Sequence, residues 1–301
     1  MLLLLAAPAA AAVPTVEPVA QPHRAAIALD GPQGIAIDAR RGEVLVANTG
    51  AHRIETYDFE GRRIAGYMHR VRAADGRLVD GAPSGLAIDA AGRTLIVDRL
   101  AAYVDVIDAR GVPVTRIEPG GAPGCVAPAN IAAVAVMTTG EILVAAGGES
   151  ARVYRFDARY RALGCWGEPG VEPGRLAGVT GIAALPDGGC AITCARTHFA
   201  VQVFSTSGEF VRGFGLHEIG PGNFSYPSGV TATADGRLWV SDEIRHIVQV
   251  FDSAGSCLGA VGGQGEAPGE FSYPSALSGD GKELLAVSER VGNRYQLLRI
   301  R

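Results

Sequence analysis

The chain repeats one short pattern six times. Most copies open with a proline, continue with a small or polar residue that is usually next to a glycine, and end in an apolar run. The copies are PQGIAID at 32–38, PSGLAID at 83–89, PANIAAVAV at 128–136, VTGIAAL at 179–185, PSGVTAT at 227–233 and PSALSGD at 274–280. A repeat of about 40–50 residues with four short strands is typical of a β-propeller blade. The sequence therefore predicts an all-β, six-bladed propeller with four antiparallel strands in each blade.

The last copy is too short to form a whole blade. Only 27 residues follow Pro274, which is room for three strands. The segment Arg24–Leu29 precedes the first copy and has no blade of its own. Pairing this segment beside the last strand would remove two open sheet edges, which otherwise promote aggregation. We therefore expect an N-terminal strand, at Arg24–Leu29, to close the last blade.

Three regions are predicted along the chain. Residues 1–12 are expected to be a signal segment, residues 13–23 a proline-rich lead-in, and residues 24–301 a single propeller domain. The first segment is apolar and ends in alanines, as signal peptides do, but it lacks the usual basic start. A start codon further upstream or a disordered alanine-rich tail are the alternatives. The interpretation of a signal segment predicts a periplasmic or extracellular protein.

The repeats resemble those of the NHL family. The resemblance rests on the inner-strand start PQGIAID, on VLVANTGAHRIETYD at 44–58 and LWVSDEIRHIVQVFD at 238–252, and on the return loops PGNF and PGEF. It covers roughly residues 25–301. The family includes binding platforms, RNA readers, scaffold domains and a few enzymes, so the resemblance implies the fold more strongly than the function.

Five cysteines, an odd number, leave at least one thiol free. They are Cys125, Cys165, Cys190, Cys194 and Cys257. Cys190 and Cys194 are four residues apart on one expected strand, roughly 13 Å, which is too far for a disulfide. Small buried apolar residues are the expected role for the cysteines, and a bridge between Cys165 and Cys190 stays open.

One set of candidate binding residues lies at the start of the inner strands. It comprises Gln33, Ser84, Ala129, Thr180, Ser228 and Ser275. These residues are expected to ring the mouth of the central channel. They are either a binding surface or simply small residues where six strands crowd together.

A second set lies where the second strands are expected to end, nine residues before the residue that closes the third strand. It comprises Asn48, Asp98, Gly147, Ala195, Asp242 and Glu289. Basic residues follow in the next loops, namely His52, Arg53, Arg99, Arg196, His198, Arg245, His246, Arg290 and Arg294. Either these residues cap loops and tie blades together, or they form a mixed-charge recognition surface.

Metal-dependent chemistry is the enzymatic alternative. Propellers that resemble this one include a lyase that binds zinc through histidines and lactonases that bind calcium through Glu, Asn and Asp side chains. The expected inner strands contain no histidine and no glutamate. Only His52, His198 and His246 fall near one face, and they come from blades that are not all adjacent. No catalytic residue, metal ion or cofactor is therefore expected.

The sequence favours an exported, non-enzymatic propeller that binds a protein, peptide or glycan partner. The binding face is expected to be the one with the loops between second and third strands. The alternative is a metal-dependent lyase or hydrolase with a site on the axis. A net charge of −4 indicates no basic surface for nucleic acid, and no apolar stretch is long enough to span a membrane.

Overall fold

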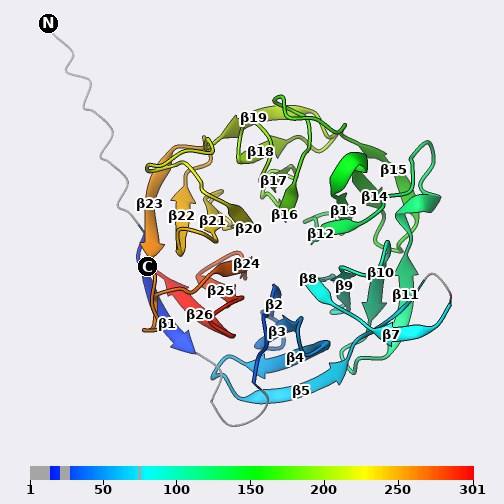
Figure 1. Cartoon of the computed structure of the whole chain (residues 1–301), viewed down its shortest axis with the longest axis horizontal. Helices are drawn as coiled ribbons and strands as arrows, with labels where there is room; N and C mark the ends of the chain where they lie inside the picture. Colours follow the sequence, from blue (N-terminus) through cyan, green and yellow to red (C-terminus); the bar gives the residue numbers. More distant parts are fainter. Residues whose placement is uncertain (1–13, 21–27, 74–75) are drawn as a thin grey trace, which may run out of the picture.

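The protein forms a ring of six antiparallel sheets around a central axis (Figure 1). The computed structural model describes residues 14–20, 28–73 and 76–301. Each sheet has four strands and is one blade, with its first strand nearest the axis. This confirms the predicted six-bladed propeller. The predicted signal segment, residues 1–12, lies outside the described residues.

The blades follow one another along the chain. Blades 1 to 3 consist of β2 (Gly34–Asp38), β3 (Glu43–Asn48), β4 (Arg53–Asp58) and β5 (Arg63–Met68); β8 (Pro83–Ile88), β9 (Thr94–Asp98), β10 (Val104–Ile107) and β11 (Pro113–Ile117); and β12 (Ile131–Val136), β13 (Ile142–Ala146), β14 (Val153–Phe156) and β15 (Ala162–Trp166). Blades 4 to 6 consist of β16 (Val179–Ala184), β17 (Cys190–Cys194), β18 (Val201–Phe204) and β19 (Phe210–Phe214); β20 (Pro227–Ala232), β21 (Leu238–Asp242), β22 (Ile247–Phe251) and β23 (Cys257–Gly262); and β24 (Pro274–Gly279), β25 (Leu284–Glu289), β26 (Arg294–Ile300) and β1 (Val16–Ala20).

Little else is regular. A short hairpin of β6 (Arg70–Arg72) and β7 (Leu78–Asp80) connects blades 1 and 2, and two single-turn helices cover Pro119–Gly121 and Gly148–Ser150. In the parts of the chain that the structure describes, no helix is long and apolar enough to cross a membrane.

The pairing registers correct two of the repeat alignments. In blade 3, Ile131 pairs with the end of the second strand, as Pro83 and Pro227 do, so this blade starts three residues later than PANIAAVAV indicates. In blade 4 the second strand ends at Cys194, not Ala195. The rule that the second strand ends nine residues before the end of the third strand fails in blades 3 and 4. In these blades the loop between the second and third strands is longer than in the other blades.

An N-terminal strand closes the ring, as expected, but it is β1 rather than Arg24–Leu29. β1 pairs antiparallel with β26, with Val16 opposite Ile300 and Glu17 opposite Arg299. Residues 24–27 lie outside the described residues. Pro18 made this segment look like a lead-in, yet a proline is tolerated on an edge strand, where its missing N–H faces away from the sheet.

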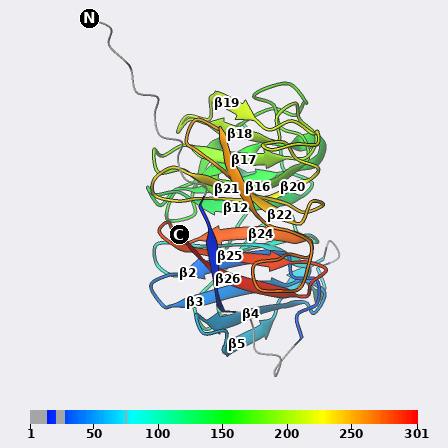
Figure 2. The same ribbon diagram turned by 90° about the vertical axis from the view of Figure 1, so that its left-hand side faces the viewer.

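The core is divided among the contacts between blades. Six apolar clusters are present in the described chain, and each joins two neighbouring blades. The cluster between blades 6 and 1, for example, packs Tyr295 and Leu297 against Val44 and Tyr57. In the side view, the strands of blades 5 and 6 face the viewer as neighbouring layers (Figure 2). Because each blade is held on both sides, the inner strands form a fixed wall around the axis.

The structure contains one disulfide, between Cys125 and Cys165. It joins the loop after blade 2 to the outer strand of blade 3, so the bridge left open between Cys165 and Cys190 does not form. Cys190 and Cys194 are buried free thiols. Burial raises the pKa of Cys190 to about 12 and that of Cys194 to about 11, so both remain protonated near neutral pH.

Candidate functional site

A cavity of about 460 Å³ lies on the axis of the ring. The inner strands begin and the second strands end on one face of the ring, which we call the upper face, because these strands pair antiparallel with Pro227 opposite Asp242. The cavity is lined by residues near the start of all six inner strands and by residues of the loops on the upper face. Every blade therefore contributes to its wall.

The predicted mouth residues do line this cavity. They are Gln33, Ser84, Thr180, Ser228 and Ser275. In blade 3 the corresponding residue is Ala132 rather than Ala129, because of the corrected register. In blades 2 to 6 a register shift accompanies this position, and bulges of this kind often re-aim side chains near functional sites.

Three of the mouth hydroxyls tie the ring together. Thr180 donates to the carbonyl of Pro227 at 2.8 Å, Ser228 to that of Pro274 at 2.8 Å, and Ser275 to that of Pro32 at 2.9 Å. Each bond joins one blade to the next. The protons of these three hydroxyls are therefore used inside the protein.

The polar residues predicted at the ends of the second strands are buried and hold loops. Asn48 accepts a hydrogen bond from the backbone of Asp30 at 2.7 Å. Asp242 accepts from Ser225 and Tyr226 at 2.8 and 3.1 Å. Asp98 is 1% exposed, beside His69. Such buried residues are not accessible to a partner. Of the two alternatives that the sequence left open, they therefore take the role of capping loops.

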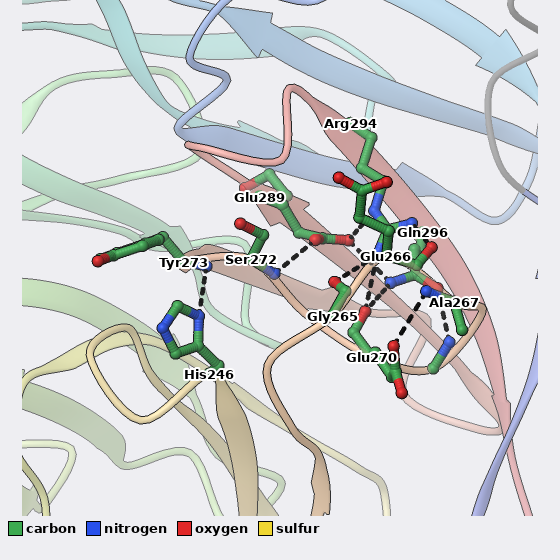
Figure 3. A network of polar contacts seen from close by, with 12 residues as sticks. His246, Gly265, Glu266, Ala267, Glu270, Ser272, Tyr273, Glu289, Arg294 and Gln296 are labelled. Carbon is green, nitrogen blue, oxygen red and sulfur yellow. Dashed lines mark hydrogen bonds and ion pairs between the residues drawn. The ribbon is translucent and has the colours of Figure 1, made fainter.

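Glu289 is the centre of the largest of these networks (Figure 3). Its two oxygens accept hydrogen bonds from the backbone of Ser272 at 2.7 Å, from Arg294 at 2.7 Å and from Gln296 at 2.8 Å. Arg294 also donates to backbone carbonyls of the loop before blade 6, among them that of Glu270 at 2.8 Å. The network fixes the return loop that leads into β24.

Most of the other predicted basic residues are also tied into the fold. Arg53 pairs with Glu55 at 2.6 Å, and Arg245 donates to the carbonyls of Gly220 and Asn223. Two of the histidines, His52 and His246, have left-handed backbone angles, φ 58 and 59. Their Nδ1 atoms bond to the carbonyl of Gly81 at 2.6 Å and to the N–H of Tyr273 at 3.1 Å. His198 packs edge-on against Phe199, and Arg196 is exposed. None of these six residues lines the axial cavity.

The charged residues that do line the cavity are the next residues along the chain. Arg99, Glu243 and Arg290 directly follow Asp98, Asp242 and Glu289. The sequence places Arg99 and Arg290 among the basic residues of these loops but gives no reason to single them out. The sequence does contain one signal for them. Each buried acidic residue that holds a loop is followed directly by a charged residue that lines the cavity.

Glu243 and Arg290 form an ion pair at the mouth. Arg290 Nε donates to Glu243 Oε1 at 2.7 Å, and a second guanidinium nitrogen contacts the same oxygen. Glu243 Oε2 has no hydrogen-bond partner among the described residues. The guanidinium of Arg99 likewise has no hydrogen bond or ion pair with any described residue. Tyr226, which is 40% exposed, and Asn130 also line the mouth.

The cavity residues do not fit a divalent cation. Calcium takes six to eight oxygen ligands, usually several of them carboxylates, whereas Glu243 is the only described carboxylate in this wall and is paired with Arg290. Within the described ranges, no group of three His, Cys, Asp or Glu side chains has metal-binding geometry.

Comparison with known proteins finds the NHL repeat in two segments, residues 29–57 and 224–251. No curated protein matches the sequence significantly. Many solved structures share the fold. One is a gluconolactonase from Xanthomonas campestris, with 16% identity, a TM-score of 0.67, and coverage of 91% of this chain and 87% of that one. Another is virginiamycin B lyase from Staphylococcus aureus, with 14% identity, a TM-score of 0.62, and coverage of 95% and 99%. A third is the calcium-binding protein regucalcin from Agrobacterium tumefaciens, with 14% identity, a TM-score of 0.62, and coverage of 91% and 92%.

These similarities correct the functional expectation. The sequence favoured a non-enzymatic binding platform, yet the similar propellers are named as a lactonase and a lyase. The alternative, an enzyme with an axial site, agrees better with these relatives and with the cavity. A metal-dependent enzyme is not supported, because the described residues of the cavity wall lack the ligands that a divalent cation needs.

Proposed function

We propose that this chain, a six-bladed β-propeller in which two NHL repeats are matched, is an enzyme of hydrolase or lyase type that acts on a small organic molecule in the axial cavity. The names of similar propellers support an enzymatic role. Their sequences are so different from this one that the acting residues follow only from the cavity of this chain.

One observation carries the proposal, and it is the arrangement of Glu243. Its side chain is 11% exposed, and one of its oxygens is held by Arg290 while the other has no partner among the residues that the structure describes. A general base must have a fixed carboxylate with one oxygen available to a proton of the substrate or of a water molecule. Glu243 is the one described cavity residue that meets this requirement.

The chemistry assigned to Glu243 is proton abstraction. In the hydrolysis of a lactone or ester, Glu243 would take a proton from water as the water oxygen attacks the carbonyl carbon. The carbon–oxygen bond to the leaving group then breaks, and the proton passes to the leaving oxygen. Tyr226 and Asn130 line the same cavity and carry donors suited to the developing oxyanion. In an elimination, Glu243 would take the proton from carbon instead, the electron pair of that bond would form a carbon–carbon double bond, and the leaving group would depart from the adjacent carbon with its bonding electrons.

The test is a substrate screen with the purified chain. The panel contains aliphatic lactones, sugar lactones, aryl esters and carboxylates with a leaving group on the β-carbon. We expect saturable turnover of one class. Absence of turnover across the panel, or turnover that does not depend on Glu243, would overturn the proposal.

Removal of metal ions should leave this turnover unchanged. The cavity offers one carboxylate, already paired with Arg290, so it should hold no structural or catalytic cation. The measurement compares rates before and after dialysis against a chelator, together with elemental analysis of the protein. A loss of activity that added calcium or zinc restores would contradict the site described above.

A further inference from the structure

We propose that the substrate of this site is an amphipathic anion, with a carboxylate bound at Arg99 and an unbranched apolar part in the channel below the mouth. The inference rests on the proposed function and names the substrate class for it. Two independent features of the cavity carry it: the distribution of charge at the mouth and the composition of the wall.

The charge at the mouth favours an anion. Arg99 belongs to blade 2, whereas Glu243 belongs to blade 5, on the opposite side of the ring (Figure 1). Glu243 and Arg290 neutralise each other, so the cavity keeps one net positive charge at Arg99. An unpaired guanidinium presents donors in a fork that fits a carboxylate. A carboxylate at Arg99 would leave the rest of the molecule facing Glu243 across the axis.

Below the mouth, the larger side chains that line the channel are aliphatic in all six blades. Two residues beyond each mouth position, every inner strand places an aliphatic side chain in the lining. These residues are Ile35, Leu86, Val134, Ile182, Val230 and Leu277. The residues between the mouth and this aliphatic ring are Gly34, Gly85, Ala133, Gly181, Gly229 and Ala276.

A polyhydroxylated substrate would not suit such a wall. Its hydroxyls would lose their bonds to water, and the hydroxyls of Thr180, Ser228 and Ser275 are already donating to the next blade. Burying a polar group without a new hydrogen bond is unfavourable, whereas each buried methylene is favourable. The substrate is therefore expected to be an acyl-type molecule rather than a sugar acid or sugar lactone.

Binding of inert carboxylates tests the inference without any turnover. The probes are acetate, butyrate, hexanoate and octanoate, with gluconate as a polar acid that has the same number of carbons as hexanoate, and binding is measured by titration calorimetry. Affinity should rise about fourfold for each methylene buried, the equivalent of about 0.8 kcal/mol. Gluconate binding as tightly as hexanoate, or affinity independent of chain length, would overturn the inference.

Two pairs of variants test where the carboxylate and the apolar part of the substrate bind. Arg99→Gln should weaken hexanoate binding by roughly 10- to 100-fold, as expected for loss of a hydrogen-bonded charge. Arg196→Gln, in the equivalent loop of blade 4 but outside the cavity lining, should not change hexanoate binding.

Ala132→Leu should narrow the passage below the mouth and remove the chain-length dependence of binding. Ala132→Ser introduces the residue found in blades 2, 5 and 6, so it should keep this dependence. Equal effects of both arginine variants, or unchanged chain-length dependence in a folded Ala132→Leu protein, would contradict the assignment.

Failure of this inference can be told apart from failure of the proposed function. Glu243→Gln removes a negative charge from the mouth, so it should bind hexanoate at least as tightly as the wild type. Chain-length-dependent binding without turnover of any panel compound would leave this inference standing and reject the proposed function. Turnover with no preference for panel compounds that carry both a carboxylate and an apolar chain would reject this inference only.

Discussion

Substitution of Glu243 by glutamine should lower kcat by about 10²–10⁴-fold, the usual contribution of a general base. The amide keeps the shape of the side chain and can still accept a hydrogen bond from Arg290, but it cannot take up a proton. The free energy of unfolding should change little, because the amide oxygen still accepts from Arg290, whose side chain is itself 42% exposed to water. The measurement is the rate on the best panel substrate, together with a denaturation curve.

The matched control for this variant is Glu149→Gln. Glu149 is an exposed glutamate in the corresponding upper-face loop of blade 3, and it does not line the cavity. Its substitution removes the same charge from the same face, so it should leave kcat unchanged. Equal rates for wild type and Glu243→Gln would show that the carboxylate is not the base.

Replacement of Glu289 by alanine should lower the free energy of unfolding by about 3–5 kcal/mol, as expected when one partner of a buried ion pair is removed. The variant leaves Arg294 and the N–H of Ser272 without their acceptor (Figure 3). Glu289→Gln should lose less, because its amide keeps one acceptor oxygen. Urea denaturation measures both. A loss for alanine no larger than that for an exposed residue would mean that the network does not hold the return loop.

The same residue gives a dependence on pH. Burial outweighs the hydrogen bonds and raises the pKa of Glu289 in the folded protein. A raised folded pKa contributes stability below the ordinary glutamate pKa, and this contribution is lost as the pH rises through the raised value. In that window, the stability of the wild type should therefore fall relative to Glu289→Gln as the pH increases. If the wild type instead gained stability relative to Glu289→Gln as the pH increased, burial would not be the dominant influence on the pKa of Glu289.

Much of the fold could be predicted from the sequence because the blade pattern is repeated. Proline starts and turn residues locate the inner strands of blades 1, 2, 5 and 6, and the ends at Asn48, Asp98, Asp242 and Glu289 agree with the structure. The alignment failed in blade 3, where Ile131 replaces the proline, and in blade 4, where a longer loop follows Cys194. The closing strand was misplaced because Pro18 resembles a linker residue.

The site was harder to predict because it depends on the direction of single side chains. Asp242 and Glu243 are neighbours of similar chemistry, yet Asp242 holds a loop by two backbone hydrogen bonds while Glu243 lines the cavity. The pairing of Glu243 with Arg290 joins blades 5 and 6 across 47 residues of chain. No local pattern in one blade contains that information, since it arises from the closed ring.

A crystal structure of Glu243→Gln soaked with the best panel substrate is the most direct test of the account. The variant should bind the intact substrate without converting it. We predict electron density in the axial cavity, with the anionic group at Arg99 and the reacting carbon beside residue 243. Density for the substrate at another place, such as the lower face or an outer strand, would contradict the assignment of the axial cavity as the active site.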